Sequence, residues 1–393
     1  FEVSVTRQEI KINNVPYYGM INETTGYIKL SGFTETASKE FGEAFTILKE
    51  KHGMKNLVFD LRGNGGGLLR ESVNIVNLFT SKGQEIVSTK GKVKDWDRVH
   101  KGLNNPLDTE IPMTVLTDRN SASASEIVSG ALQDLDRAVI IGQRTFGKGL
   151  VQQTRPLSYN SQMKVTVARY YIPSGRSIQK IDYAHRNKDG SVGSFADSLI
   201  KPFKTKNGRI VYDAKGIMPD IETDVRKLSN ITISLLNESH IFDYATIYRK
   251  KNLKIADAKT FRISDAEYDE FVKFLDGKAY AYTTQTEKIV EQLKTTAEAE
   301  KYFEEFIKEY DQLQAKVKNK KDGDLYRFKD EIKEILENEI VSRYYFQKGR
   351  IENALNYDAE ILKATEALNN KSLYTSILAG TNSTVSKKVT EEQ

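Results

Sequence analysis

Residues 55–67 read KNLVFDLRGNGGG, and this stretch decides the fold. Its first part, residues 55–61, has a continuous apolar centre, which is typical of a strand in a sheet that is covered on both faces. The glycine-rich part, residues 62–67, leads into a segment at 68–79 with apolar residues at helical spacing. A buried strand, a glycine turn and a helix in this order predict one unit of an α/β domain.

The same alternation continues on both sides of this stretch. Strands are predicted at 26–33, 113–117 and 138–141. An amphipathic helix is predicted at 36–51, and a further helix at 123–135. Strands that alternate with helices in this way indicate that the front part of the chain is an α/β domain.

The pattern of polar and apolar residues predicts the structure of three further segments in the front part of the chain. Residues 1–12, FEVSVTRQEIKI, alternate apolar and polar side chains and predict a strand. A hairpin-like strand is predicted at 164–171. Residues 182–206 are polar and irregular, so we expect a long surface loop there.

The composition changes after the α/β segment, where Lys, Glu, Leu, Ile, Phe and Tyr recur at helical spacing. Long helices are predicted at 289–317 and 325–345, and SDAE at 264–267 fits a capping box. The pattern predicts a separate all-helical domain at 229–379, followed by a polar tail at 380–393.

Composition excludes several classes of protein. The chain has 393 residues, 39% of them hydrophobic, and a net charge of +5 from 59 basic and 54 acidic residues. No basic run with interleaved aromatics suggests nucleic-acid binding, and no apolar run approaches the roughly 18 residues of a membrane span. Without cysteine there are no disulfides or thiolate metal sites. The first residue is Phe1, and we expect a piece of a longer polypeptide whose export signal has been removed.

Serines crowd the start of one predicted helix. The run NSASASE occupies residues 120–126, and FGKG follows at 146–149. Cysteine is absent, and none of the four histidines lies in either segment: His52, His100, His185 and His240. If the protein transfers acyl groups, a serine with a lysine base is therefore the natural candidate.

Each of these features has an ordinary structural interpretation as well. Serine is a favoured helix N-cap, an isolated lysine is usually a solvated charge, and the run at 63–67 could be a tight turn. The same run, placed before a helix, could instead offer amides to an anion. A lysine acts as a base only when its amine is neutral, and burial lowers a lysine pKa from about 10.4. Phe146, Leu150 and Val151 offer Lys148 an apolar setting.

Residues 142–148, GQRTFGK, match the spacing of a phosphate-binding loop after a strand. Gly149 stands where such a loop needs Ser or Thr for magnesium, and the following LVQQTRPL reads as extended. Without a helix N-terminus behind it, the loop lacks the amides that cradle a phosphate. Nucleotide binding is therefore disfavoured.

Five segments in order carry a resemblance to a known family. They are NLVFDLRGNGGGLL, DRNSASASEIVSGALQD, IGQRTFGKGLVQ, ARYYIPSGRSIQ and KGIMPDIE. Over roughly residues 1–228 the chain resembles the carboxy-terminal processing peptidases, also called tail-specific proteases. The resemblance implies a crotonase-like (ClpP/crotonase type) α/β protease core at 16–228. It also implies a PDZ domain that is largely missing here, with residues 1–15 as its last strand.

The family pattern assigns a role to each matching residue. It implies Ser123 as the nucleophile and Lys148 as the general base, with Gln152 holding the lysine amine. The oxyanion hole would combine the amide of Ala124 with that of Gly66 or Gly67. No metal or cofactor is implied.

The resemblance implies a serine endopeptidase that cleaves exported or unfolded proteins near their C-termini. Its substrates would be proteins or peptides with free C-termini, which the PDZ domain would dock as an added strand. It implies a bacterial periplasmic or otherwise extracytoplasmic location, with the signal peptide removed, and leaves open a homo-oligomer or an adaptor protein. The alternative is a catalytically silent binding scaffold on the same fold, which retention of every catalytic residue type disfavours.

Overall fold

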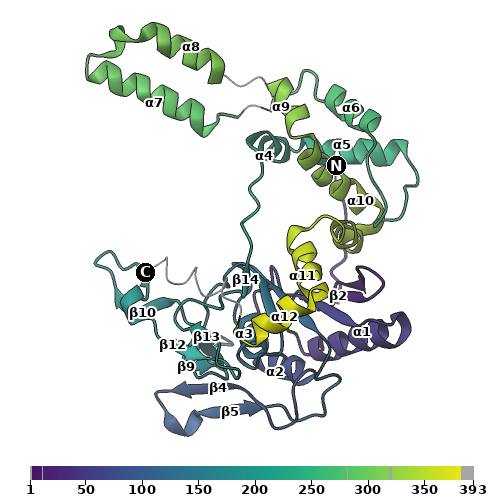
Figure 1. Cartoon of the computed structure of the whole chain (residues 1–393), viewed down its shortest axis with the longest axis vertical. Helices are drawn as coiled ribbons and strands as arrows, with labels where there is room; N and C mark the ends of the chain where they lie inside the picture. Colours follow the sequence, from purple (N-terminus) through teal and green to yellow (C-terminus); the bar gives the residue numbers. More distant parts are fainter. Residues whose placement is uncertain (1, 11, 281, 318–320, 382–393) are drawn as a thin grey trace. The chain divides into compact units, whose positions relative to one another are not determined.

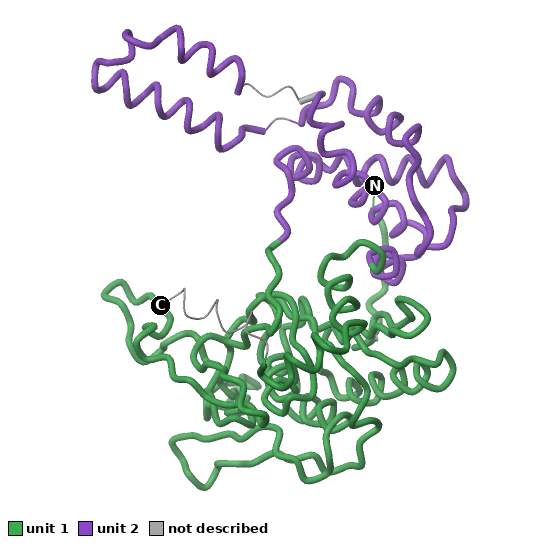
Figure 2. Tube along the Cα trace, viewed as in Figure 1, with its two compact units in different colours: residues 1–225, 355–393 green, residues 226–354 purple. Residues whose placement is uncertain are grey.

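The computed structural model has two compact units (Figure 2). It describes residues 2–10, 12–280, 282–317 and 321–381. Unit 1 comprises residues 1–225 and 355–393, and unit 2 comprises residues 226–354. The polypeptide thus leaves unit 1, forms the whole of unit 2, and then returns to complete unit 1.

A six-stranded sheet organises unit 1 (Figure 1). Its spatial order is β1 (Tyr17–Met20), β2 (Thr25–Lys29), β3 (Asn56–Asp60), β6 (Met113–Thr117), β7 (Val139–Gly142) and β14 (Ile221–Glu222). The pair β1–β2 is antiparallel, and the remaining neighbours are parallel. Every residue of β6 and β7 is buried, which confirms the expectation of a sheet covered on both faces.

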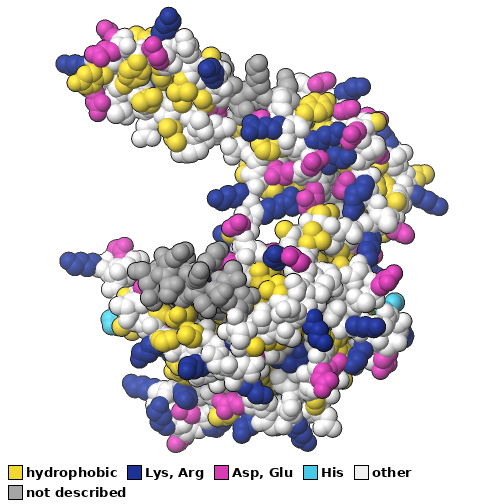
Figure 3. Space-filling view, in the orientation of Figure 1, with side chains coloured by type: hydrophobic (Ala, Val, Ile, Leu, Met, Phe, Trp, Pro, Cys, Tyr) yellow, Lys and Arg dark blue, Asp and Glu magenta, His cyan; other side chains and the backbone are white. Residues whose placement is uncertain are grey.

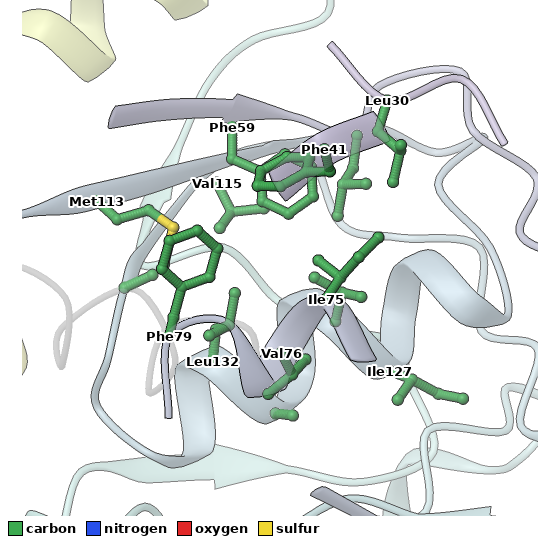
Figure 4. Close-up of a cluster of buried hydrophobic side chains, with 14 of the residues drawn as sticks. Leu30, Phe41, Phe59, Ile75, Val76, Phe79, Met113, Val115, Ile127 and Leu132 are labelled. Carbon is green, nitrogen blue, oxygen red and sulfur yellow. The ribbon is translucent and has the colours of Figure 1, made fainter. Parts of the chain in front are cut away.

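Three helices cover one face of this sheet: α1 (Ala37–His52), α2 (Leu69–Asn77) and α3 (Ala124–Asp134). Figure 4 shows the core that they enclose. The ring centroids of Phe41 on α1 and Phe59 on β3 lie 4.5 Å apart, and Phe79 meets Phe41 edge-on at 6.0 Å. Each fully buried side chain of this size contributes about 1.5–3 kcal/mol, so this face supplies much of the stability that holds the sheet.

The opposite face is closed by the end of the chain. Helices α11 (Ala359–Asn369) and α12 (Lys371–Leu378) belong to unit 1 and contact β3, β6 and β7. Side chains alternate along a strand, so Val58 and Leu116 face away from the α1–α3 layer and are fully buried. The Tyr374 hydroxyl also accepts the Met113 N–H at 3.0 Å.

This packing changes the expected domain limits. The sequence placed residues 355–379 in the helical domain, but they lie with the α/β unit. Arg62, at the end of β3, pairs with Asp60 at 2.8 Å and with Asp358 at the start of α11 at 2.9 Å. The helical pattern of these residues shows that α11 and α12 each have an apolar face. It does not show that this face packs on the sheet of unit 1 rather than on the other helices.

A second, antiparallel sheet lies beside the first in unit 1. Its order is β5 (Arg98–Lys101), β4 (Glu85–Gly91), β9 (Gln162–Tyr171) and β8 (Leu150–Pro156). Two hairpins follow, β10 (Ile181–Arg186) with β11 (Val192–Ser194) and β12 (Pro202–Lys204) with β13 (Ile210–Tyr212). Single 3₁₀ turns occur at Lys94–Trp96 and Asp197–Leu199.

Two expectations for unit 1 are wrong. Residues 182–206 form hairpins rather than an irregular loop, and the first turn closes with the Asn187 N–H donating to the Ser191 carbonyl at 2.9 Å. That hairpin is largely exposed, so it lacks the apolar alternation that reveals a strand. Residues 2–10 are exposed and form no strand within the described chain. Their side chains alternate as in a strand, but no neighbouring strand offers hydrogen-bond partners to their backbone N–H and C=O groups.

Unit 2 is helical, as expected. Its helices are α4 (Asn230–Asn237), α5 (His240–Lys251), α6 (Asp265–Phe274), α7 (Gln285–Ala299), α8 (Ile307–Val317), α9 (Lys321–Arg327) and α10 (Lys329–Ala354), with a 3₁₀ turn at Phe303–Glu305. The capping box is confirmed, because Glu267 accepts the Ser264 N–H at 2.8 Å and donates its own N–H to the Ser264 hydroxyl. The single helix predicted over 289–317 is instead two helices, broken where Lys301 has φ +63°. Within the described residues, no helix has the length and apolarity needed to cross a bilayer.

Candidate active site

Three loops meet at one edge of the main sheet. They follow β3, β6 and β7, which are adjacent and parallel, so their carboxyl ends lie side by side. The crevice outside the carboxyl ends of parallel strands is where α/β folds bind ligands. The loops at 61–67, 118–123 and 143–149 therefore carry the glycine run, the serine cluster and the lysine to one place.

Ser123 occupies the turn between β6 and α3 in a strained conformation. Its backbone has φ 57° and ψ −111°, a region that residues with side chains rarely adopt, at a cost of about 1–3 kcal/mol. The Ser123 N–H donates to Glu126 Oε2 at 2.8 Å, which helps to hold this geometry. In α/β-hydrolases, a sharp turn from a strand into a helix exposes a serine side chain.

The neighbouring serines have structural hydrogen bonds instead. The Ser121 hydroxyl donates to the Leu61 carbonyl at 2.9 Å, and the Ser125 hydroxyl donates to the Asn64 carbonyl at 2.8 Å. Both bonds tie the start of α3 to the loop after β3. Ser123 is the serine of the cluster that lines the adjoining cavity.

That cavity, which we call the site cavity, has a volume of about 450 Å³. It brings together all six residues that the sequence singled out: Gly66, Gly67, Ser123, Ala124, Lys148 and Gln152. Its apolar lining comes from Leu68, Leu69, Ile127, Leu150 and Val151. In the described chain no hydrogen bond joins Lys148 Nζ to the Ser123 hydroxyl or to Gln152, although the three side chains face the same space.

The two glycines differ in what their amides do. The Gly66 N–H donates to Asn64 Oδ1 at 2.9 Å. The N–H groups of Gly67 and Ala124 have no acceptor among the described residues. Gly66 has φ +98°, and a Cβ there would lie 2.9 Å from the Ala124 nitrogen. Gly66 therefore lets the loop approach the start of α3, while the Gly67 and Ala124 amides stay available to a ligand.

Glu126 is a site residue to which the sequence assigned no role. Its carboxylate is fully buried and accepts four hydrogen bonds. The donors are the N–H groups of Ser123, Gly147 and Lys148 and the hydroxyl of Thr145, at 2.6–2.8 Å. Burial raises the pKa of Glu126, and the four hydrogen bonds oppose that rise. The S-x-x-E spacing from Ser123 to Glu126 is the signal that could have found it.

Tyr170 on β9 links the same two loops from the other side. Its hydroxyl lies 3.2 Å from the Ser123 carbonyl and also contacts the Lys148 carbonyl. Burial raises the pKa of Tyr170 well above its usual range, so the hydroxyl stays protonated. Glu126 and Tyr170 together fix the backbones of Ser123 and Lys148 relative to each other.

The structure also bears on the phosphate-loop alternative. Strand β8 begins at Leu150, directly after the lysine segment. No helix N-terminus stands behind residues 142–148, so the amides and the dipole that bind a phosphate are missing.

Two parts of the chain match models of known protein families. Residues 24–185 match the family described as "Peptidase family S41", and residues 231–368 match "Probable PDZ-protease, C-terminal helical domain". The α/β part of the chain, which carries the site, thus matches peptidase family S41, and the later part matches a C-terminal helical domain. Its curated relatives include proteins named as carboxy-terminal processing peptidases or proteases, which confirms the resemblance seen in the motifs.

Individual relatives cover part of the chain. It is 43% identical over 184 residues to the carboxy-terminal-processing protease of Bartonella bacilliformis, covering 46% of this chain and 42% of that protein. It is 36% identical over 192 residues to the chloroplastic C-terminal processing peptidase of Tetradesmus obliquus, covering 46% and 40%. The solved photosystem II D1 C-terminal processing protease aligns with a TM-score of 0.41 and 31% identity, over 56% of this chain and 50% of that chain. The matches thus span less than half the length of these two curated relatives.

Proposed function

We propose that this chain carries the catalytic core of a serine endopeptidase of the carboxy-terminal processing type. The observation that supports this most directly is the site cavity, in which Ser123, Lys148 and two uncommitted amides line one apolar space. A nucleophile, a base and an oxyanion site are the parts that acyl transfer needs.

In the proposed first step, the Ser123 hydroxyl oxygen bonds to the carbonyl carbon of the scissile peptide bond. The neutral amine of Lys148 takes the hydroxyl proton. Negative charge develops on the carbonyl oxygen, where the N–H groups of Ala124 and Gly67 donate to it. Gln152, on β8, would hold the lysine amine in line with both partners.

In the second step the C–N bond breaks, and the protonated Lys148 returns its proton to the departing amine. An ester between Ser123 and the N-terminal part of the substrate remains. Water then loses a proton to Lys148 and attacks this ester, and the proton passes to the Ser123 oxygen as the new carboxylic acid leaves. No cofactor enters either step.

Replacement of Ser123 or Lys148 by Ala tests the assignment. Both variants should lose cleavage of an unfolded protein and keep the circular dichroism spectrum of the parent, and a chelator should leave the parent's activity unchanged. An active-site-directed serine reagent should label Ser123. Near wild-type turnover by Lys148→Ala would refute the assignment of Ser123 as nucleophile with Lys148 as base. A parent protein that neither cleaves the substrate nor reacts with the reagent would support the alternative, a catalytically silent binding scaffold.

Further features are part of the same proposal. We propose a crotonase-like core, with a PDZ domain before residue 16 in the full-length protein. The description of the family matched by residues 231–368 supports the PDZ domain. We also propose an extracytoplasmic location, as the resemblance implies, and a full-length precursor without an export signal would contradict it. A homo-oligomer or an adaptor would show as a larger mass in light scattering.

A further inference from the structure

A second cavity adjoins the site cavity and has no role in the steps above. Its volume is about 950 Å³, at the upper end of the range for ligand sites. Lys148, Leu150 and Gln152 line both cavities, so the two meet at the proposed base. We call this second space the basic cavity, because of the side chains described next.

Three cations line the basic cavity in addition to Lys148: Lys90 at the end of β4, Lys92 just after it and Arg169 on β9. No acidic residue lines it, and within the described chain none of the three forms an ion pair with a carboxylate. Lys90 lies over the Tyr171 ring at 5.2 Å and Arg169 over the Phe195 ring at 5.8 Å, contacts that leave both charges uncompensated.

The strand register places two of these positive charges directly opposite each other. Lys90 and Arg169 are direct partners across the β4–β9 pair. Like charges opposite each other on neighbouring strands destabilise a sheet, so the fold gains nothing from this pair. An anionic ligand would compensate both charges at once. Phe146, Ile181 and Tyr183 supply apolar surface between the cations, as a peptide ligand requires.

The chemistry of the proposed reaction says which part of a substrate reaches this cavity. The base must return its proton to the departing amine, so the segment after the scissile bond begins at Lys148. The basic cavity contains Lys148 but neither Ser123 nor the amides of Gly67 and Ala124. It therefore lies on the side of the departing segment, and the site cavity holds the acyl side.

We propose that the basic cavity binds carboxylates in the segment that follows the scissile bond. The carboxylate can be an Asp or Glu side chain or the terminal carboxylate of a short tail. This inference rests on the proposed protease function and assigns substrate selection to the core itself. It differs from the expectation that a PDZ domain alone reads the substrate's end.

The experiment uses peptides with one common sequence up to the scissile bond and three tails of equal length. One tail has Asp and Glu with an amidated end, one has Asn and Gln with a free carboxylate, and one has Asn and Gln with an amidated end. The cleavage rate constant kcat/KM is measured for the parent and for the triple variant Lys90→Gln, Lys92→Gln, Arg169→Gln. The matched control is Lys55→Gln, Lys188→Gln, Lys201→Gln, three exposed lysines outside both cavities.

The parent and the control should cleave an anionic tail about tenfold better than the neutral amidated tail, since three partly exposed charge pairs add to that size. The preference should fall in the triple variant and at high salt. Whichever anionic tail carries the preference identifies the side-chain or the terminal carboxylate as the ligand. Equal rates for all tails in the parent, or a preference that persists in the triple variant, would overturn the inference.

Binding separates this inference from the proposed function. Fluorescence anisotropy of the isolated tails, labelled at the end that follows the scissile bond, needs no cleavage. If the chain cleaves nothing but binds anionic tails more tightly than the triple variant does, the protease assignment fails and the cavity assignment stands. If it cleaves but binds all three tails equally, the reverse holds.

Discussion

Ser123 and Lys148 donate their backbone N–H groups to the same carboxylate oxygen, Oε2 of Glu126, each at 2.8 Å. The two residues are delivered by loops after different strands, β6 and β7, so one buried atom sets the distance between their backbones. Glu126 does not face the substrate in the proposed reaction. It is a positioning residue, and its effect should appear in the rate of chemistry.

Replacement of Glu126 by Gln should lower kcat about 100-fold with little change in KM, because misplacement of reacting groups by about 1 Å has an effect of this size. The glutamine side chain has nearly the volume of glutamate. Its NH₂ group replaces one carboxylate oxygen, however, so two of the four hydrogen-bond donors face another donor instead of an acceptor. Steady-state kinetics checks this, with Glu43→Gln on the exposed face of α1 as the control. A rise in KM alone would contradict the positioning role.

Two adjacent glycines provide a matched test of the loop after β3. Gly66→Ala should reduce kcat/KM at least 100-fold, since the new Cβ would lie 2.7 Å from the Ala122 carbonyl oxygen and 2.9 Å from the Ala124 nitrogen. Gly65→Ala should stay within a few-fold of the parent, because no atom lies within 4 Å of its Cβ. If both variants behave alike, close approach of the loop to α3 does not govern the site.

The three serines of the cluster should differ in their roles: one should be needed for reactivity, and the other two should contribute to stability. Ser121→Ala and Ser125→Ala should each lower the free energy of unfolding by about 0.5–1.5 kcal/mol, since each removes one hydrogen bond from a buried carbonyl that keeps another donor. Both should still react with a serine-directed reagent. Ser123→Ala should lose that labelling and keep its stability. Urea unfolding and mass spectrometry of the labelled protein measure the two properties.

Acid should destabilise unit 1 through Asp60. Burial opposes ionisation of this carboxyl, but Arg62 and Lys29 outweigh burial and hold the pKa of Asp60 well below its usual range. Its stabilising effect is complete above the unfolded-state pKa near 4 and is lost as the pH falls below that value. Asp60→Asn should be about 3 kcal/mol less stable at pH 7 and should lose less stability on acidification. Urea titrations at pH 7 and pH 3, with exposed Asp95→Asn as control, decide this.

The sequence predicts well what is carried by local patterns. The strands at 56–60 and 113–117 have apolar centres, and a helix was predicted after each of them. The candidate site was predictable because short motifs fix residue types at fixed intervals. The four donors that converge on Glu126 were not, since three of them come from a loop 19–22 residues away whose position depends on the sheet.

The wrong expectations for the strand near the N-terminus and for the domain limit have a common cause. A sequence pattern indicates a strand or a helix, but it does not indicate which other element that strand or helix packs against. Residues 2–10 alternate like a strand but lie beside no other strand in the described chain. Helices α11 and α12 have the spacing of the helices before them but bury their apolar faces on β3, β6 and β7. The basic cavity was equally hidden, because Lys90 and Arg169 are 79 residues apart and only the β4–β9 register makes them neighbours. Surface charge gives no hint, since basic and acidic side chains are interspersed on the face in Figure 3.

Because unit 1 is closed only by residues 355–381, the ribosome must finish unit 2 before the sheet can be covered on its second face. Until α11 and α12 emerge, fully apolar side chains such as Val58 and Leu116 stay open to water. The serine and lysine loops are synthesised more than 200 residues earlier, yet Arg62, beside the glycine run, meets its partner Asp358 only after residues 226–354 of unit 2 have been synthesised. The order of synthesis thus delays maturation of the site until α11 and α12 have followed unit 2 out of the ribosome.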